Sequence, residues 1–271
     1  MTELPTIAGL LTEVKTQKPL VHHITNYVTV NDCANIVLAL GGSPVMADDA
    51  AEVAEMAAIA SALVLNIGTL NARTIAAMLL AGKQANDLGI PVILDPVGVG
   101  ATSLRNATAA RLLQELKLAV LRGNMSEIKV IAGLDAKTRG VDSGDDSAAD
   151  GPQIAAALAR KLGCVVAITG VQDIVADERR IALIDNGHPL LAKVTGTGCM
   201  ATSLIGCYAG VSRDYFQAAA AGLITMGLAG EQAQAGLAAG EGVGSFRSRL
   251  LDRIESLTPT GLIQGGKYHA L

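Results

Sequence analysis

Aromatic residues are scarce in this chain: they make up 2% of its 271 residues, and tryptophan is absent. Proteins that bind single-stranded nucleic acid stack the bases on aromatic side chains and hold the phosphates with a basic surface. The formal net charge here is −4, and no stretch is rich in lysine and arginine. The sequence therefore predicts no nucleic-acid partner.

Paired cysteines are also lacking. The four cysteines, Cys33, Cys164, Cys199 and Cys207, are scattered, and none forms a CxxC pair. This spacing argues against a zinc site or a disulfide framework and fits a reducing compartment. The first fifteen residues include an acidic residue near the start and no long apolar core, which is not typical of a signal peptide. We therefore expect a cytoplasmic protein.

Charged residues make up only 17% of the chain, whereas 50% of the residues are hydrophobic. Such a composition excludes extensive disorder. Residues 194–212 carry no charge at all, over a length close to that of a membrane span. Glycine, serine and threonine are frequent in that run, so we interpret it as a helix buried inside a large protein. The sequence predicts no membrane association.

Short apolar runs alternate with segments of helical periodicity. The runs with strand character are 19–24, 43–46, 62–67, 91–95, 118–122 and 164–169. Short, almost purely apolar strands are typical of a sheet buried on both faces. The alternation predicts an α/β fold, with a mostly parallel central sheet and helices on both faces.

Three further segments complete the predicted organisation. Residues 173–187 indicate two short strands joined by a charged turn, and therefore an antiparallel edge. Residues 200–257 indicate helices. Residues 140–152 are polar and rich in Gly and Asp, and we interpret them as a loop rather than a linker, because the α/β pattern resumes at once. A single domain over residues 1–271 is expected.

Two common nucleotide-binding motifs are missing. The segment "AGKQA" at 81–85 lacks the first glycine and the Ser or Thr of a Walker A motif, and "GVGATS" at 98–103 lacks the third glycine of GxGxxG. Neither a P-loop nor a dinucleotide-binding fold is predicted.

Polar residues follow the predicted strands, at the edge where a parallel sheet binds ligands. Arg122 is suited to a phosphate, and Asp95 and Glu127 are suited to Mg²⁺. Thr169 ends the strand 164–169. Each residue also has a structural explanation: Asp95 begins a common Asp-Pro turn, Glu127 suits the first turn of a helix, and Arg122 suits a surface ion pair.

The segment "KVTGTGCMATSLIG", residues 193–206, places Gly196, Thr197 and Gly198 directly before Cys199 and an apolar helical run. Free backbone N–H groups at a helix start form an anion site, and the glycines allow a close approach. The alternative is a flexible turn beside a buried thiol. Two adjacent histidines, His22 and His23, point to opposite faces of a strand, which favours structural or pocket-lining roles over a shared metal.

The combination of these motifs resembles one family. "GTGC" from Gly196 is similar to the anion-hole motif of ribokinase-like kinases, and "NMSE", residues 124–127, is similar to their NxxE motif. Together with "HHITNYVTVNDCAN", "GGSPVMADDAAEV", "LVLNIGTL", "PVILDPVGVGAT", "AITG" and "VTGTGC", the chain resembles the hydroxyethylthiazole kinase family of thiamine salvage along nearly its whole length.

The resemblance implies a ribokinase-like fold and ATP-dependent phosphorylation of the primary hydroxyl of 5-(2-hydroxyethyl)-4-methylthiazole. It implies that Arg122 and Thr169 contact ATP, and that Asp95 and Glu127 organise Mg²⁺ and the phosphates. It also implies a homotrimer with active sites between neighbouring subunits.

The same resemblance implies that Met46 and Gly196 contact the thiazole and that Asn26 lies near it, with an anion hole at Gly196, Thr197 and Gly198. An apolar pocket that includes Met46 and Val28 suits a small neutral ring.

Cys199 stands where most ribokinase-like members carry aspartate, and members of the thiazole kinase family carry cysteine there. We expect Cys199 to open the helix and a helix N-terminus to lower its thiol pKa, which would allow the thiolate to accept the hydroxyl proton. We interpret Cys199 as a modest base, less important than the anion hole. The alternative is a thiol that only shapes the pocket.

Three other functions stay open at this point. One is a kinase for another small alcohol on the same fold, another is a lyase or repair enzyme that uses the nucleotide differently, and the third is a catalytically silent binding protein. The combined presence of Asp95, Glu127 and the 196–199 turn argues against silence.

Overall fold

The computed structural model describes residues 3–134 and 150–271. In this part of the chain, nine strands form one sheet in the order β2-β1-β3-β4-β5-β6-β7-β8-β9. Every pairing from β2 to β6 is parallel, and the pairings of β6 with β7, β7 with β8 and β8 with β9 are antiparallel. The predicted α/β class with a mostly parallel sheet is confirmed. The strands are β1 (Leu20–Ile24), β2 (Ser43–Val45), β3 (Ala62–Asn66), β4 (Val92–Asp95), β5 (Val120–Asn124), β6 (Val165–Thr169), β7 (Asp173–Ala176), β8 (Ile181–Ile184) and β9 (Tyr268–Ala270).

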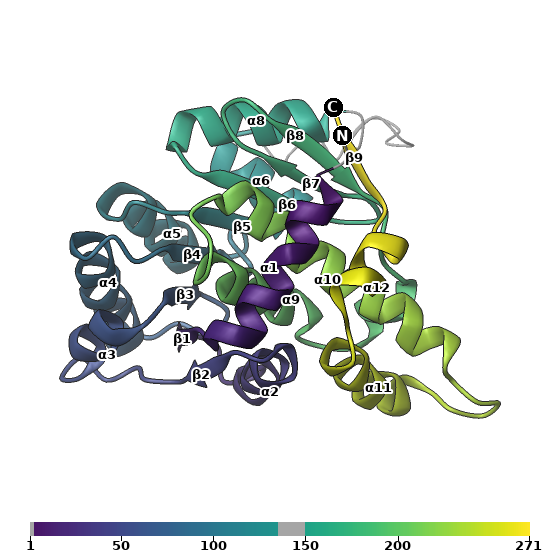
Figure 1. The fold of residues 1–271 in the computed structure, drawn as a ribbon. Helices are drawn as coiled ribbons and strands as arrows, with labels where there is room; N and C mark the ends of the chain where they lie inside the picture. The colour runs from purple at the N-terminus through teal and green to yellow at the C-terminus, as the bar shows by residue number, and fades with distance from the viewer. Residues whose placement is uncertain (1–2, 135–149) are drawn as a thin grey trace.

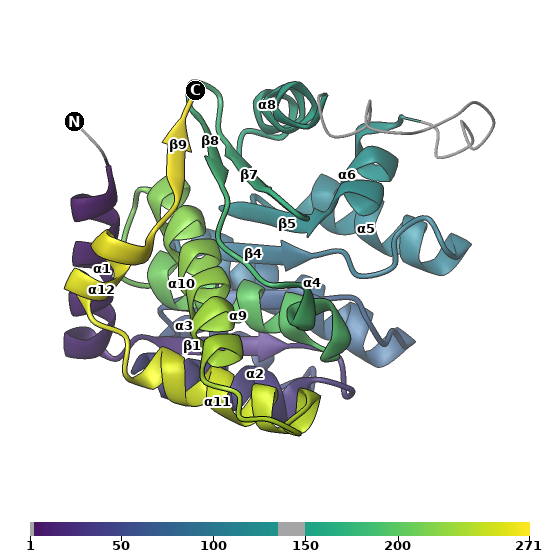
Figure 2. The ribbon, with the colours of Figure 1, turned by 90° about the vertical axis from the view of Figure 1, so that its right-hand side faces the viewer.

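Helices cover both faces of the sheet, and α1 and α8 lie on opposite sides of the strands (Figures 1 and 2). The helices α1, α2 and α9 to α12 pack against one face, and α3 to α6 with α8 pack against the other. The helices are α1 (Leu4–Gln17), α2 (Val30–Leu40), α3 (Val53–Ile59), α4 (Ala72–Asp87), α5 (Ser103–Glu115), α6 (Met125–Ala132), α8 (Gly151–Leu162), α9 (Thr197–Ala209), α10 (Tyr215–Ala235), α11 (Val243–Glu255) and α12 (Pro259–Gly265), with a 3₁₀ turn η1 (Pro189–Lys193).

The central strands are apolar because both of their faces are covered. Successive side chains alternate between the two faces, so Val64 packs in one hydrophobic cluster and Leu65 packs in the other. Register pairs Leu65 with Leu94 and Asn66 with Asp95. The polar residues at the strand ends therefore meet at one edge of the sheet, as the sequence predicted.

The predicted hairpin is confirmed as β7 and β8, with the charged turn between them. Arg180 follows this turn, donates to both carboxylate oxygens of Asp214 at 2.8 Å and lies 4.3 Å from the centre of the Phe216 ring. These contacts fasten the hairpin to the start of α10. Neither α12 nor the short strand β9, which pairs with β8, was predicted from the sequence.

The uncharged run 194–212 forms α9, which is buried from Met200 to Ala209 and packs against α10. This agrees with a helix inside an α/β protein. Within residues 3–134 and 150–271, no helix is long and apolar enough to cross a membrane. Most of the predicted loop 140–152 lies outside the described residues, and its last two residues, Gly151 and Pro152, begin α8.

Candidate active site

Two glycines shape the start of α9. Gly196 is the N-cap and has φ +86°, a conformation that glycine adopts without strain. A Cβ on Gly196 would lie 2.6 Å from Cγ2 of Thr29, and a Cβ on Gly198 would lie 2.8 Å from Nη1 of Arg122. Only glycine therefore allows Thr29 and Arg122 to approach the backbone this closely at these two positions. The helix begins at Thr197, so the expectation that Cys199 opens it is wrong, and Cys199 is the third residue of the first turn.

The first turn of α9 presents unused hydrogen-bond donors. The first N–H of this helix to bond back is that of Met200, which donates to the carbonyl oxygen of Gly196 at 2.8 Å. Among the described residues, no group accepts from the N–H of Thr197, Gly198 or Cys199. Such a turn forms an anion site because its free N–H groups carry partial positive charge.

Cys199 lies in a group of polar side chains that we name the sulfur network: Asn26, Asn66, Asp95, Cys199 and Thr202. The Sγ atom of Cys199 accepts from Nδ2 of Asn66 at 3.2 Å and from Nδ2 of Asn26 at 3.4 Å. Asn26 also bonds through Oδ1 to the backbone and hydroxyl of Thr29, the residue that packs against Gly196. Asn26 thus helps to fix both the sulfur and the glycine turn.

The expected fall in the pKa of Cys199 is wrong. Burial raises the pKa of this thiol, and the nearby charge of Asp95 raises it further, while hydrogen bonds from Thr29, Asn66 and Asn26 act in the opposite direction. The sequence indicated the helix N-terminus but not the surrounding apolar shell, and loss of water disfavours a thiolate more than these donors favour it.

Asp95 ends β4 and is completely buried. Its Oδ2 accepts from Oγ1 of Thr202 at 2.8 Å and from Nδ2 of Asn66 at 3.0 Å, and it lies 3.6 Å from Nη1 of Arg122. Burial raises the pKa of Asp95, and Arg122 and Thr202 oppose that rise. In the described part of the chain, the buried Oδ1 has no hydrogen-bond partner.

Arg122 lies within β5, which continues to Asn124 rather than ending at residue 122 as predicted, and its side chain meets that of Thr169 at the end of β6. Nη2 of Arg122 donates to Oγ1 of Thr169, and the two strands pair in parallel register. Arg122 is buried and pairs with Asp95, so it is not the surface ion pair of the alternative explanation.

Glu127 is the third residue of α6 and completes a capping box with the N-cap Asn124. Its two carboxylate oxygens accept from the backbone N–H groups of Gly98, at 2.8 Å, and Asn124, at 2.9 Å. The structural explanation, that Glu127 suits the first turn of a helix, is therefore confirmed. Its negative charge also raises the pKa of Asp95, which places the two carboxylates within electrostatic reach of each other.

Both histidines of β1 are buried and make separate hydrogen bonds. Nε2 of His22 bonds with the carbonyl oxygen of Ala47 at 2.8 Å, and Nε2 of His23 bonds with Oγ of Ser203 at 3.1 Å. This agrees with structural roles on opposite faces. His22 holds the loop that carries Met46, which is half-buried after β2 and lies at the same edge of the sheet as Asn26.

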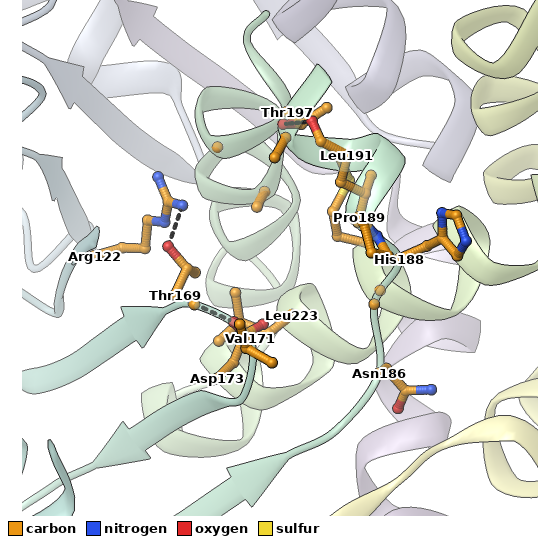
Figure 3. A pocket seen from close by; sticks show the side chains of 17 residues that line it. Arg122, Thr169, Val171, Asp173, Asn186, His188, Pro189, Leu191, Thr197 and Leu223 are labelled. Carbon is orange, nitrogen blue, oxygen red and sulfur yellow. Dashed lines mark hydrogen bonds between the residues drawn. The ribbon is translucent and has the colours of Figure 1, made fainter. Parts of the chain in front are cut away.

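A cavity of about 630 Å³ opens beside the start of α9 (Figure 3). Arg122 and Thr169 lie at one end, and His188 and Asn186 lie towards the other. We name it the α9 cavity; it is lined by Arg122, Thr169, Gly170, Val171, Asp173, Asn186, Gly187, His188, Pro189, Leu191, Ala192, Thr197, Gly198, Ala201, Leu223, Met226 and Gly227.

The first turns of α9 separate the α9 cavity from the sulfur network. Thr197, Gly198 and Ala201 line the cavity, whereas Cys199 and Thr202 belong to the network. The helix start that carries these N–H groups therefore lies between the α9 cavity and Sγ of Cys199. A phosphoryl group bound at this turn would have space for a long ligand on one side and an acceptor for a proton on the other.

Sequence reasoning missed several residues here. Asn66 is not among the candidate residues that the sequence singled out, although it ends an apolar strand, and Thr202 lies in the run interpreted as a buried helix. Arg105 was not noticed, although its guanidinium donates to the carbonyl oxygens of Ile67, Gly68 and Val97 and braces two strand-end loops. A polar residue inside an apolar helix was the available signal for Thr202.

Comparisons with known proteins show which family the chain belongs to. The sequence profile of the hydroxyethylthiazole kinase family matches residues 11–260. A hydroxyethylthiazole kinase of Alkaliphilus oremlandii (strain OhILAs) is 56% identical over 261 residues, which are 96% of each chain. The structure of a hydroxyethylthiazole kinase protein from Pyrococcus horikoshii OT3 superposes with a TM-score of 0.89 at 36% identity, covering 98% of this chain and 99% of that one.

A ribokinase-like superfamily protein from Enterococcus faecalis V583 shares the fold alone, with a TM-score of 0.63 at 12% identity over 93% of this chain and 95% of that one. The extent of the profile match and the level of identity establish the family. The chain belongs to the hydroxyethylthiazole kinase family.

Proposed function

We propose that this chain transfers the terminal phosphoryl group of ATP to the primary hydroxyl of 5-(2-hydroxyethyl)-4-methylthiazole. The family supports the substrate pair. The observation that carries the proposal is the start of α9, where no described residue accepts from the N–H groups of Thr197, Gly198 and Cys199. Two of these residues, Thr197 and Gly198, line the α9 cavity, and Cys199 belongs to the sulfur network. Phosphoryl transfer depends on positioning and charge stabilisation, which this turn supplies.

The α9 cavity is proposed as the nucleotide site. Its polar end, with Arg122 and Thr169 beside the helix start, suits the phosphates, because a guanidinium binds phosphate oxygens in pairs. Its other walls include the apolar side chains of Leu223 and Met226, which suit a flat base.

Mg²⁺ is proposed to bind between Asp95 and Glu127. The buried Oδ1 of Asp95 has no hydrogen-bond partner among the described residues, so it suits contact with a hard cation or with a water bound to it. Both oxygens of Glu127 already accept backbone N–H groups. Glu127 therefore fits a contact through water better than a direct one. When bound, the ion would supply positive charge that neutralises the negative charge developing on the phosphates during transfer.

Cys199 is proposed as a modest base. As the substrate oxygen bonds to phosphorus and the bond to the ADP oxygen breaks, the hydroxyl proton would pass to Sγ, provided that the sulfur is a thiolate. The raised pKa of the thiol limits the thiolate fraction near neutral pH, so the sulfur contributes less than the anion hole.

The alcohol is proposed to lie beside Asn26, Gly196 and Met46. Next to Asn26, the side chains of Tyr27 and Val28 are 80% and 56% exposed, which is unusual for two adjacent apolar groups at a binding site. We propose that a neighbouring subunit covers them in a homotrimer and completes the site. Light scattering coupled to gel filtration measures this directly, and a monomer would contradict it.

The decisive experiment is thiazole-dependent ADP release with Mg-ATP, with the product checked by mass. We expect the acceptor to gain one phosphate. Release of ADP with another alcohol only would favour a different kinase of this fold, ADP release without a phosphorylated acceptor would favour a lyase or repair enzyme, and tight binding without turnover would favour a silent binder.

A further inference from the structure

Asn66 is the side chain that connects the reacting sulfur to the buried carboxylate. It ends β3, is 1% exposed and pairs in register with Asp95 on β4. Its Nδ2 donates to Oδ2 of Asp95 at 3.0 Å and to Sγ of Cys199 at 3.2 Å. Its Oδ1 accepts from Nδ2 of Asn26 at 3.0 Å and from the backbone N–H of Gly68 at 2.9 Å.

These four contacts fix which way the amide faces. An amide rotated by half a turn would bring Nδ2 against two other donors, Asn26 Nδ2 and the N–H of Gly68, and would leave Oδ1 against a carboxylate. Gly68 enforces the close packing, because a Cβ there would lie 2.9 Å from Cβ of Asn26 and 3.0 Å from Oδ1 of Asn66. The donors of Asn66 must therefore face Asp95 and Cys199.

We propose that Asn66 is a positioning residue that acts on the reaction through Cys199. Two amide donors, from Asn66 and Asn26, hold Sγ as an acceptor, which aims the sulfur and favours its thiolate. Sγ accepts hydrogen bonds from these two amides, with the Thr29 hydroxyl as a further neutral donor, whereas Oδ2 of Asp95 keeps both the Thr202 hydroxyl and the positive charge of Arg122. Loss of Asn66 therefore weakens the hold on the sulfur more than the hold on the carboxylate.

This inference rests on the proposed phosphoryl transfer, and a double-mutant cycle between Asn66→Ala and Cys199→Ala tests it. We expect Asn66→Ala to lower kcat about 10-fold, in the lower range for loss of proton-transfer catalysis. In the Cys199→Ala background the same change should cost less than about threefold, because residues that act as a unit are not additive. Equal losses in both backgrounds would overturn the proposal.

The split between kinetic constants separates positioning from general damage. Asn66 does not line the α9 cavity, so the KM for ATP should stay within about twofold of wild type. An increase in that KM with kcat unchanged would contradict the assignment. If Asn66→Ala does not fold, Asn66→Ser replaces it, because a serine hydroxyl still accepts from the N–H of Gly68 but is too short to reach Sγ.

Asn86→Ala is the matched control. Asn86 makes two hydrogen bonds to the backbone of Lys117, at 2.7 and 2.8 Å, and joins the end of α4 to the segment before β5. It lies outside both the α9 cavity and the sulfur network, so its removal should lower Tm without lowering kcat. A loss of kcat equal to that of Asn66→Ala would show that damage to the fold alone explains the effect.

Alkylation of Cys199 by iodoacetamide gives a readout that needs no turnover. Cys33, Cys164 and Cys207 are buried, so Cys199 is the accessible thiol of the chain. Because the thiolate is the nucleophile, removal of a donor to Sγ should slow alkylation of Asn66→Ala at least about threefold, measured by mass at one pH. An unchanged rate would overturn the proposal even if wild type showed no thiazole kinase activity, which would refute the proposed function separately.

Discussion

The α9 cavity and the sulfur network lie on either side of the same helix start, yet they use polar groups in opposite ways. The cavity has Arg122 and Thr169 at one end and Asn186 and His188 towards the other, and small and apolar side chains make up most of its remaining walls. The network packs amides, a carboxylate, a hydroxyl and a thiol into continuous hydrogen bonds within a buried space.

This difference between the α9 cavity and the sulfur network fits the different tasks proposed for them, which are binding a nucleotide and orienting a reacting hydroxyl. A long anionic ligand gains most of its binding from contact with one charged end and with apolar walls, so it tolerates an open, sparsely polar site. A reacting hydroxyl gains from orientation within tenths of an ångström, which requires side chains that cannot rotate. Changes to the shared helix start should therefore affect both sides, and changes on one side should affect one kinetic constant.

The largest effect is expected from Gly198→Ala, which changes the first turn of α9 between the α9 cavity and the sulfur network. The added Cβ would lie 2.8 Å from Nη1 and 3.0 Å from Nη2 of Arg122, so the guanidinium must move away from Thr169 and Asp95. We expect kcat/KM to fall about 100-fold or more, as when an oxyanion-hole group is lost.

Gly244→Ala is the control for this substitution. Gly244 is also the second residue of a helix, α11, and within the described residues a Cβ there meets nothing closer than 4 Å. It should leave kcat/KM unchanged. Activity of Gly198→Ala within threefold of wild type would contradict the assignment of this turn as the anion hole.

A smaller effect is expected from Cys199→Ala, which acts on the network alone. Steady-state kinetics should give a kcat lower by about 10-fold with an unchanged KM for ATP, because a modest base is lost and the cavity is intact. Cys199→Asp supplies an acceptor that is ionised more readily and should keep kcat well above that of Cys199→Ala. Full kcat in Cys199→Ala would leave the thiol only a role in shaping the pocket.

The polar residues that follow the strands were predicted well, because an apolar run that ends in a polar residue is easy to recognise in a sequence. Asp95, Arg122 and Thr169 each follow an apolar run, and parallel register brings such ends together. The glycine turn was recognisable for a similar reason, since Gly196 is needed for a positive φ that other residues rarely adopt.

The remainder depended on packing, which a linear pattern does not contain. The raised pKa of Cys199 comes from burial beneath residues distant in sequence. Leu223 and Met226 reach the cavity from α10, a helix so uniformly apolar that its pattern marks no special face. Asn66 looked like any other polar residue at a strand end, and its importance appears only from its four partners.

A change confined to the cavity should affect ATP alone, and Val171→Ser tests this. Val171 lines the α9 cavity and its side chain is fully exposed, so its substitution should not disturb folding. We expect the KM for ATP to rise about three- to tenfold from lost apolar contact, with the KM for the thiazole unchanged. Leu104→Ser, at a half-exposed position on α5, is the control. An equal rise in both KM values would contradict the proposal that the α9 cavity binds ATP and not the thiazole.

The smallest effect is a pH dependence of stability that originates in the cavity. Burial raises the pKa of Asp173 from its ordinary 3.8 to about 6, while the N–H of Gly170, which donates to Oδ1 at 2.9 Å, and the charge of Arg122 oppose the rise. Between about pH 4 and 6 the folded protein therefore holds this proton more tightly than the unfolded chain does. Stability falls as the pH rises through that window.

Asp173→Asn removes the ionisation and keeps an oxygen for Gly170, so its Tm should exceed that of wild type at pH 8. The difference should shrink as the pH falls towards 4, where the carboxyl group of the folded wild type is protonated and that of the unfolded chain is partly protonated. We expect several degrees at pH 8, since a pKa difference of about two units is about 3 kcal/mol and about 1 kcal/mol shifts Tm by roughly 2–4 °C in a domain of about this size. Thermal melts of ligand-free protein from pH 4 to 8 measure it, with Asp252→Asn, at an exposed carboxylate of α11, as the control. A Tm difference independent of pH would mean that Asp173 is ionised as readily in the cavity as in water, and the cavity would then be wetter and more polar than its walls indicate.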